Sequence, residues 1–129
     1  MNEAGPVAPS VMPTSGALSG YFRVAAVLFA IAGAVHFYQF VTAPAFSAFH
    51  ATFALLDPAV AWLMIRRPLW FVYVFPAFVA QQIYAHGSLL AQSIRDGGFD
   101  AVSALIVLFM LLTAVLLFAD RARRSRLSA

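Results

Sequence analysis

The sequence predicts an all-α integral membrane protein that folds as an up-down four-helix bundle. Of its 129 residues, 63% are hydrophobic and only 10% are charged, too little polar surface for a soluble domain of this length. The apolar residues fall into runs of about 20, which is the length of a helix that crosses a lipid bilayer. The separators between the runs are short, so that neighbouring helices must be antiparallel.

Four apolar runs define the predicted helices. They cover residues 21–42, 45–65, 69–92 and 99–119, which together form the predicted transmembrane domain, residues 21–119. Residues 1–20 are rich in Pro, Gly, Ser and Ala and lack the basic and apolar parts of a signal peptide, so we expect a disordered tail. Residues 120–129 form a basic tail. The chain has no cysteine, which excludes disulfides and thiolate metal sites.

The arginines predict the orientation in the membrane. With four crossings, seven of the eight arginines fall on the side that carries both termini, and Arg95 alone falls on the other. Positive charge concentrates on the cytoplasmic side of membrane proteins. We therefore expect cytoplasmic termini in a bacterial-type inner membrane. The basic tail then serves as an anchor to lipid headgroups, and no nucleic-acid partner is expected.

Small residues in the first helix predict a packing face. Ala26, Ala30 and Ala34 recur every four residues, with Gly33 beside them. This spacing allows two membrane helices to approach closely.

Three histidines and one aspartate are the unusual residues of the apolar segments. His36, His50 and His86 each lie about 8–9 Å inside the outer ends of their helices, at 1.5 Å per residue. Asp57 lies near the middle of the second segment and shares a helix face with His50, because seven residues are close to two turns. An ionisable group at this depth usually faces a bundle interior. We expect a buried polar site in the outer half.

Prolines leave the shape of two helices open. Pro58 either bends the second helix or, with Asp57 as its cap, starts a new segment after a break. Pro76 is expected to bend the third helix, and Pro68 to be its first residue.

One interpretation of the polar site is metal binding. His36, His50 and His86 are predicted to bind zinc or copper, because three imidazoles with an open fourth position form a known metal site. The expected second shell, which orients the rings and carries protons, consists of Asp57, Gln82 and Gln39.

A second interpretation is haem b. His36 and His86 lie on the first and third helices, which are diagonal partners in a simple bundle, and histidine is an established axial ligand of haem iron. Gly33 and Gly87 would leave room for the flat macrocycle.

The function predicted first is an accessory or cofactor-holding subunit of a membrane complex. The first alternative is an oligomeric proton-coupled transporter of a small molecule or ion that uses Asp57. The second alternative is a purely structural subunit. Motifs of serine hydrolases, phosphate-binding loops and dinucleotide sites are absent, so no catalytic residue and no enzyme activity are predicted. The expected partners are the lipid bilayer and either a larger membrane protein or further copies of the chain.

Overall fold

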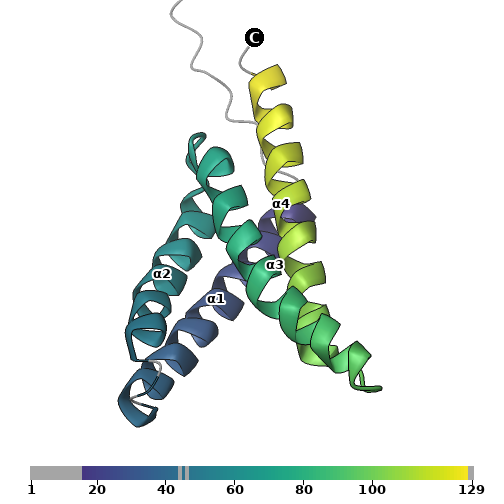
Figure 1. Cartoon of the computed structure of the whole chain (residues 1–129). Coiled ribbons are helices and arrows are strands. Elements are labelled where there is room, and N and C mark those ends of the chain that lie inside the picture. The colour runs from purple at the N-terminus through teal and green to yellow at the C-terminus, as the bar shows by residue number, and fades with distance from the viewer. Residues whose placement is uncertain (1–15, 44, 46, 128–129) are drawn as a thin grey trace, which may run out of the picture.

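The described part of the protein consists of four α-helices joined by short connections (Figure 1). The computed structural model describes residues 16–43, 45 and 47–127. Its helices are α1 (Gly16–Thr42), α2 (Ser47–Arg66), α3 (Phe71–Arg95) and α4 (Ala101–Leu127). The predicted all-helical class and the number of helices are confirmed over these residues.

Two helices, α1 and α4, extend five or more residues beyond the apolar runs that predicted them. α1 begins at Gly16, so residues 16–20 of the predicted tail are helical, while residues 1–15 lie outside the described part. α4 continues to Leu127 and includes most of the predicted basic tail, of which residues 128 and 129 are not described. A helix can continue beyond an apolar run when its residues have adequate helix propensity and its side chains pair one turn apart.

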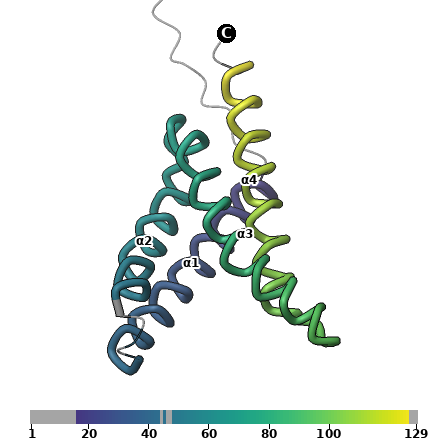
Figure 2. Tube along the Cα trace, in the orientation of Figure 1, coloured from purple at the N-terminus to yellow at the C-terminus, as the bar shows by residue number. Residues whose placement is uncertain are grey.

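The helices form two antiparallel hairpins, α1–α2 and α3–α4. Within each hairpin the two backbones run close together. Between the hairpins, close approach of the backbones is mainly between α1 and α4. The hairpins meet where the first part of α1 lies beside α4, and they diverge toward the α1–α2 and α3–α4 turns (Figures 1 and 2). The fold is therefore a splayed version of the predicted up-down bundle.

Aromatic side chains join the two hairpins. The Phe29 ring of α1 lies 6.3 Å from the Phe75 ring and 5.7 Å from the Phe109 ring, measured between centroids. The Phe53 ring of α2 lies 6.1 Å from the Phe78 ring of α3. Such offset and edge-on pairs stabilise a core beyond their buried area. These large rings fill the space that the separated backbones leave.

Two of the four small residues predicted to form a packing face on α1 are buried. Ala26 and Gly33 are buried, whereas Ala30 and Ala34 are exposed. At Gly33 the approach of α2 is very close, since a Cβ atom there would lie 2.7 Å from Cδ of Pro58. α2 continues through Pro58 without a break, and α3 likewise continues through Pro76. Pro68 lies in the connection before α3, where its carbonyl accepts a hydrogen bond from Phe71 N–H at 3.0 Å.

We expect Gly33→Ala to destabilise the α1–α2 hairpin by about 1–3 kcal/mol, because overpacking forces a rigid proline ring to move. Gly20→Ala is the matched control, because nothing lies within 4 Å of a Cβ atom at that position. Thermal unfolding in detergent, followed by circular dichroism, compares the two variants. Equal stability of both would contradict the close contact between Gly33 and Pro58.

Three of the four helices, α1, α2 and α4, are long and apolar enough to cross a membrane. α3 has the length, but amides and other polar side chains (Gln81, Gln82, His86, Ser88 and Gln92) interrupt its apolar run. Large apolar side chains are exposed along the helices, among them Val27 on α1, Leu55 on α2 and Leu108 on α4. Contiguous exposed apolar surface of this kind indicates contact with lipid.

Candidate functional site

A buried carboxylate and two imidazoles come together between α1 and α2. His36 Nδ1 lies 3.1 Å from His50 Nδ1, and His36 Nε2 lies 3.8 Å from Asp57 Oδ2. Asp57 is only 3% exposed, whereas both histidines are half-buried. His36 therefore stands between the other two and connects the hairpin turn to the buried acid.

The local sequence explains this geometry. His50 and Asp57 are two turns apart on α2, so both face α1. Gly33, one turn before His36, lets α1 approach α2 and brings the imidazole to that face. A helix with a bulkier residue at this position would hold the His36 ring farther from Asp57.

Aromatic rings surround the middle imidazole. The His36 ring lies 5.3 Å from the Phe53 ring and 6.0 Å, edge to face, from the Phe49 ring. Phe53 is buried and Phe49 is exposed. The two phenylalanines fix the orientation of the His36 ring and reduce its contact with solvent, which strengthens its electrostatic interaction with Asp57.

The contact between the two Nδ1 atoms constrains the protons of the rings. A hydrogen bond between two ring nitrogens requires that one carries a proton and the other offers a lone pair. If His50 donates, His36 carries its own proton on Nε2, toward Asp57. If His36 donates, its Nε2 is free to accept a proton from Asp57. The geometry thus couples the protonation of all three groups.

His86 takes a different partner. Its Nδ1 lies 3.3 Å from Ser103 Oγ of α4, so both partners belong to the α3–α4 hairpin. Ser103 N–H also donates to Asp100 Oδ1 at 3.0 Å, at the start of α4. The hydrogen bonds from Ser103 hold the pKa of Asp100 below its ordinary value. His86 is therefore bonded, through Ser103, to the first turn of α4, which Asp100 caps.

The predicted cofactor sites find little support in this arrangement. Over the described residues, no group of three or more His, Asp or Glu side chains is placed to hold a metal ion. The metal site of His36, His50 and His86 thus stays a prediction without a formed ligand set. Next to Gly33, the space predicted for a haem is filled by Pro58, whereas a Cβ atom at Gly87 would meet only Ile83, at 3.8 Å.

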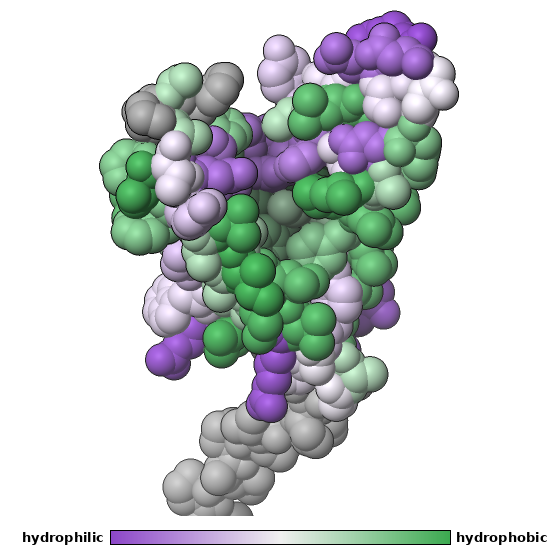
Figure 3. Space-filling view, turned by 90° about the horizontal axis from the view of Figure 1, so that it is seen from below, coloured by the Kyte–Doolittle hydropathy of each residue, from purple (hydrophilic) through white to green (hydrophobic). Residues whose placement is uncertain are grey.

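The predicted second shell is divided between helices. Asp57 contacts His36, as described above. Gln82 of α3 is buried and Gln39 of α1 is half-buried. Seen from the end with the two turns, hydrophilic side chains form a band across the surface between the hairpins (Figure 3). The polar side chains at this end thus come from both hairpins.

A charged cluster at the opposite end was not predicted. Asp120 of α4 is 1% exposed and its carboxylate lies 3.3 Å from Arg67 Nη1 and 2.8 Å from Arg124 Nη2. Arg124 and Arg121 also donate to the carbonyls of Arg67 and Leu69, both at 2.9 Å. This cluster fastens the α2–α3 connection to α4. The signal in the sequence was a lone acid four residues before an arginine in a basic segment.

The comparisons with known proteins give no match. Neither a protein-family model, nor a curated protein, nor a solved structure is similar to the chain.

Proposed function

We propose that the protein is a membrane protein that binds and passes protons through His50, His36 and Asp57, as the proton-carrying part of an oligomeric transporter. The observation that carries the proposal is the continuous series of contacts from a half-buried imidazole to a carboxylate that is 3% exposed. Ionisable groups held inside membrane proteins commonly serve proton relays.

The three groups can move one proton without any further residue. We take Asp57 protonated, His36 with its proton on Nδ1, and His50 with its proton on Nε2. Asp57 gives its proton to His36 Nε2, and His36 gives its Nδ1 proton to His50 Nδ1. His50, now an imidazolium, releases its Nε2 proton to water. One proton has left Asp57, and each imidazole ends neutral in its other tautomer.

The 3.8 Å separation between His36 and Asp57 sets one requirement for this transfer. It exceeds the length of a direct hydrogen bond. A small rotation of the Asp57 side chain or one bridging water closes it. The Nδ1 to Nδ1 contact at 3.1 Å already has hydrogen-bond length.

Beyond Asp57 the relay meets the apolar core. Val60, Ala61 and Met64, on the following turns of α2, are buried with Phe22 in the hydrophobic cluster. A proton that reaches Asp57 can therefore return by the same route or leave only when the packing opens. The sparse backbone contact between the hairpins allows such a movement, as alternating access requires.

The same residues fit a haem or a metal ion less well. The third histidine lies in the α3–α4 hairpin, where it bonds Ser103, and Pro58 occupies the surface beside Gly33. A proton, unlike a metal ion, needs only two neighbouring groups at a time.

The arginines support an orientation for the proposed membrane protein. Ion pairs and ring contacts place Arg67 beside Asp120 and over the Phe22 ring, so the start of α1, the end of α2 and the end of α4 lie together. These are the segments that carry seven of the eight arginines. We propose that this end is cytoplasmic, in a bacterial-type inner membrane, and that the histidine end faces outward.

Proton flux into proteoliposomes tests the proposed function. With a potassium diffusion potential, negative inside, and a pH-sensitive dye in the lumen, we expect the native chain to acidify the lumen. Asp57→Asn should reduce this rate about tenfold or more, because the amide neither releases nor binds the proton. Asp96→Asn, at the exposed α3–α4 turn, is the control and should behave as the native chain. Equal rates for native and Asp57→Asn protein would refute the proposal.

A further inference from the structure

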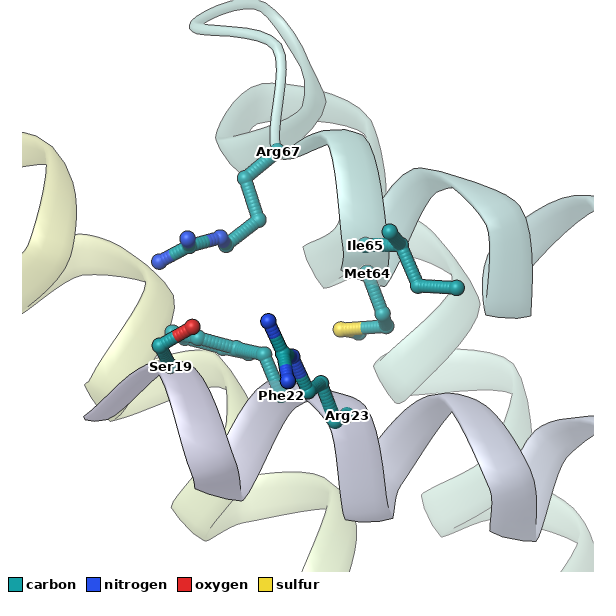
Figure 4. Close-up of a pocket in the computed structure, with 6 residues that line it drawn as sticks. All are labelled: Ser19, Phe22, Arg23, Met64, Ile65 and Arg67. Atoms are coloured by element: carbon teal, nitrogen blue, oxygen red, sulfur yellow. The ribbon is translucent and has the colours of Figure 1, made fainter. Parts of the chain in front are cut away.

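A cavity of about 170 Å³ lies at the arginine-bearing end, between α1 and the end of α2. Its lining consists of Ser19, Phe22, Arg23, Met64, Ile65 and Arg67. The guanidinium groups of Arg23 and Arg67 enter the cavity from opposite sides, and the Ser19 hydroxyl points into it beside them (Figure 4). The volume is well above the roughly 10–15 Å³ that a cavity needs to hold one water.

The cavity carries excess positive charge. Among the described residues, Asp120 is the acid at this end, since Asp57 lies in the middle of α2 and Asp96 and Asp100 lie near the α3–α4 turn. The single carboxylate of Asp120 is shared by Arg67 and Arg124. Arg23 adds a further cation on the opposite wall, so an anion between the two guanidinium groups would be held by both.

The donors match a phosphate group. A guanidinium offers five N–H donors in a planar fork, so Arg67 keeps donors for a ligand while one binds Asp120. Ser19 adds a hydroxyl, which donates to a third oxygen. Phe22, Met64 and Ile65 make the rest of the lining apolar, which suits the carbon-bearing side of a phosphate ester.

We propose that this cavity binds a phosphate group, carried by the headgroup of an anionic phospholipid or by a small phosphate solute. The cavity lies at the end of the apolar helices, which is the level at which lipid headgroups meet a membrane protein. The site is independent of the histidines and Asp57, which lie toward the other end of α1 and α2.

Binding to the full chain in a phosphate-free maltoside detergent tests the site. Native mass spectrometry measures retained phosphatidylglycerol, and calorimetry measures inorganic phosphate. We expect Arg23→Gln to weaken binding about tenfold, as for the loss of a charge-assisted hydrogen bond. Arg66→Gln is the matched control, because Arg66 lies over the Trp62 ring and does not line the cavity. Ser19→Ala removes one donor without a change of charge and should weaken binding by about threefold.

The outcomes separate the sources of the phosphate. Lipid retained by native and Arg66→Gln protein, but weakened in Arg23→Gln and Ser19→Ala, supports a headgroup site. The same pattern with inorganic phosphate alone supports a solute site. If Arg23→Gln and Arg66→Gln lose affinity equally, the binding is general surface charge and the proposal fails. It fails also if neither ligand binds the native chain.

Discussion

Asp120→Ala should lower the free energy of unfolding by about 3 kcal/mol, near the lower end of the range for a broken buried ion pair. The carboxylate is 1% exposed and compensates two arginines, Arg67 and Arg124. Without it, Arg67 stays beside the buried Phe22 ring as a cation with no carboxylate. The connection between α2 and α3 then loses its ion pair with α4 and keeps the hydrogen bonds that Arg124 and Arg121 donate to its carbonyls. Arg124 is partly exposed, so water recovers part of the loss.

Denaturation of the detergent-solubilised chain with increasing SDS measures this effect. Asp96→Ala is the control, since an exposed turn residue should change stability by no more than about 0.5 kcal/mol. A second variant that combines Asp120→Ala with Arg67→Leu should recover part of the loss, because the charge that was left unpaired is also removed. If Asp120→Ala is as stable as Asp96→Ala, the cluster does not fasten the α2–α3 connection.

His36→Phe should abolish proton flux and leave the fold intact. A phenyl ring keeps the aromatic packing against Phe49 and Phe53 but has no nitrogen to receive or give a proton. Asp57 then keeps its burial and loses its link to His50. In the proteoliposome assay, we expect the rate of His36→Phe to fall to that of Asp57→Asn, with an unfolding temperature close to that of the native chain.

His86→Phe distinguishes the relay from the site predicted from sequence. In the structure His86 bonds Ser103 within its own hairpin, α3–α4, so its loss should leave most of the flux unchanged. If His86→Phe removes the flux as completely as His36→Phe, the three histidines act together and the relay through α1 and α2 alone is wrong.

The helices were predictable because each one is specified by an apolar run in the sequence. Each apolar run is long enough for one crossing, and prolines, glycines and arginines mark the connections. The ends were less predictable. Hydropathy falls at residue 120, but α4 continues to Leu127 because Asp120 and Arg124 pair one turn apart. α1 likewise begins at Gly16, five residues before its apolar run.

The candidate site was predictable in part. The seven-residue spacing places His50 and Asp57 on one face of α2, and the structure has both facing His36. The rotation of α1 depends on Gly33 packing against Pro58, which no pattern within a single helix specifies. His86 was expected to complete the site because a regular bundle brings all helices together at one depth. Large phenylalanine side chains lie between the hairpins, and few backbone contacts join them, so the ends that carry the α1–α2 and α3–α4 turns diverge. His86 therefore bonds Ser103 within its own hairpin.

The contact between the two imidazoles is tested most directly by NMR of the full chain with ¹⁵N-labelled histidine rings. If a proton lies between the rings, the Nδ1 nuclei of His36 and His50 share a scalar coupling across the hydrogen bond. We expect that coupling in the native chain and in His86→Phe, and its loss in His50→Phe. Two uncoupled Nδ1 resonances in the native chain, with the His36 resonance unchanged by His50→Phe, would show that the rings share no hydrogen bond and would contradict the relay.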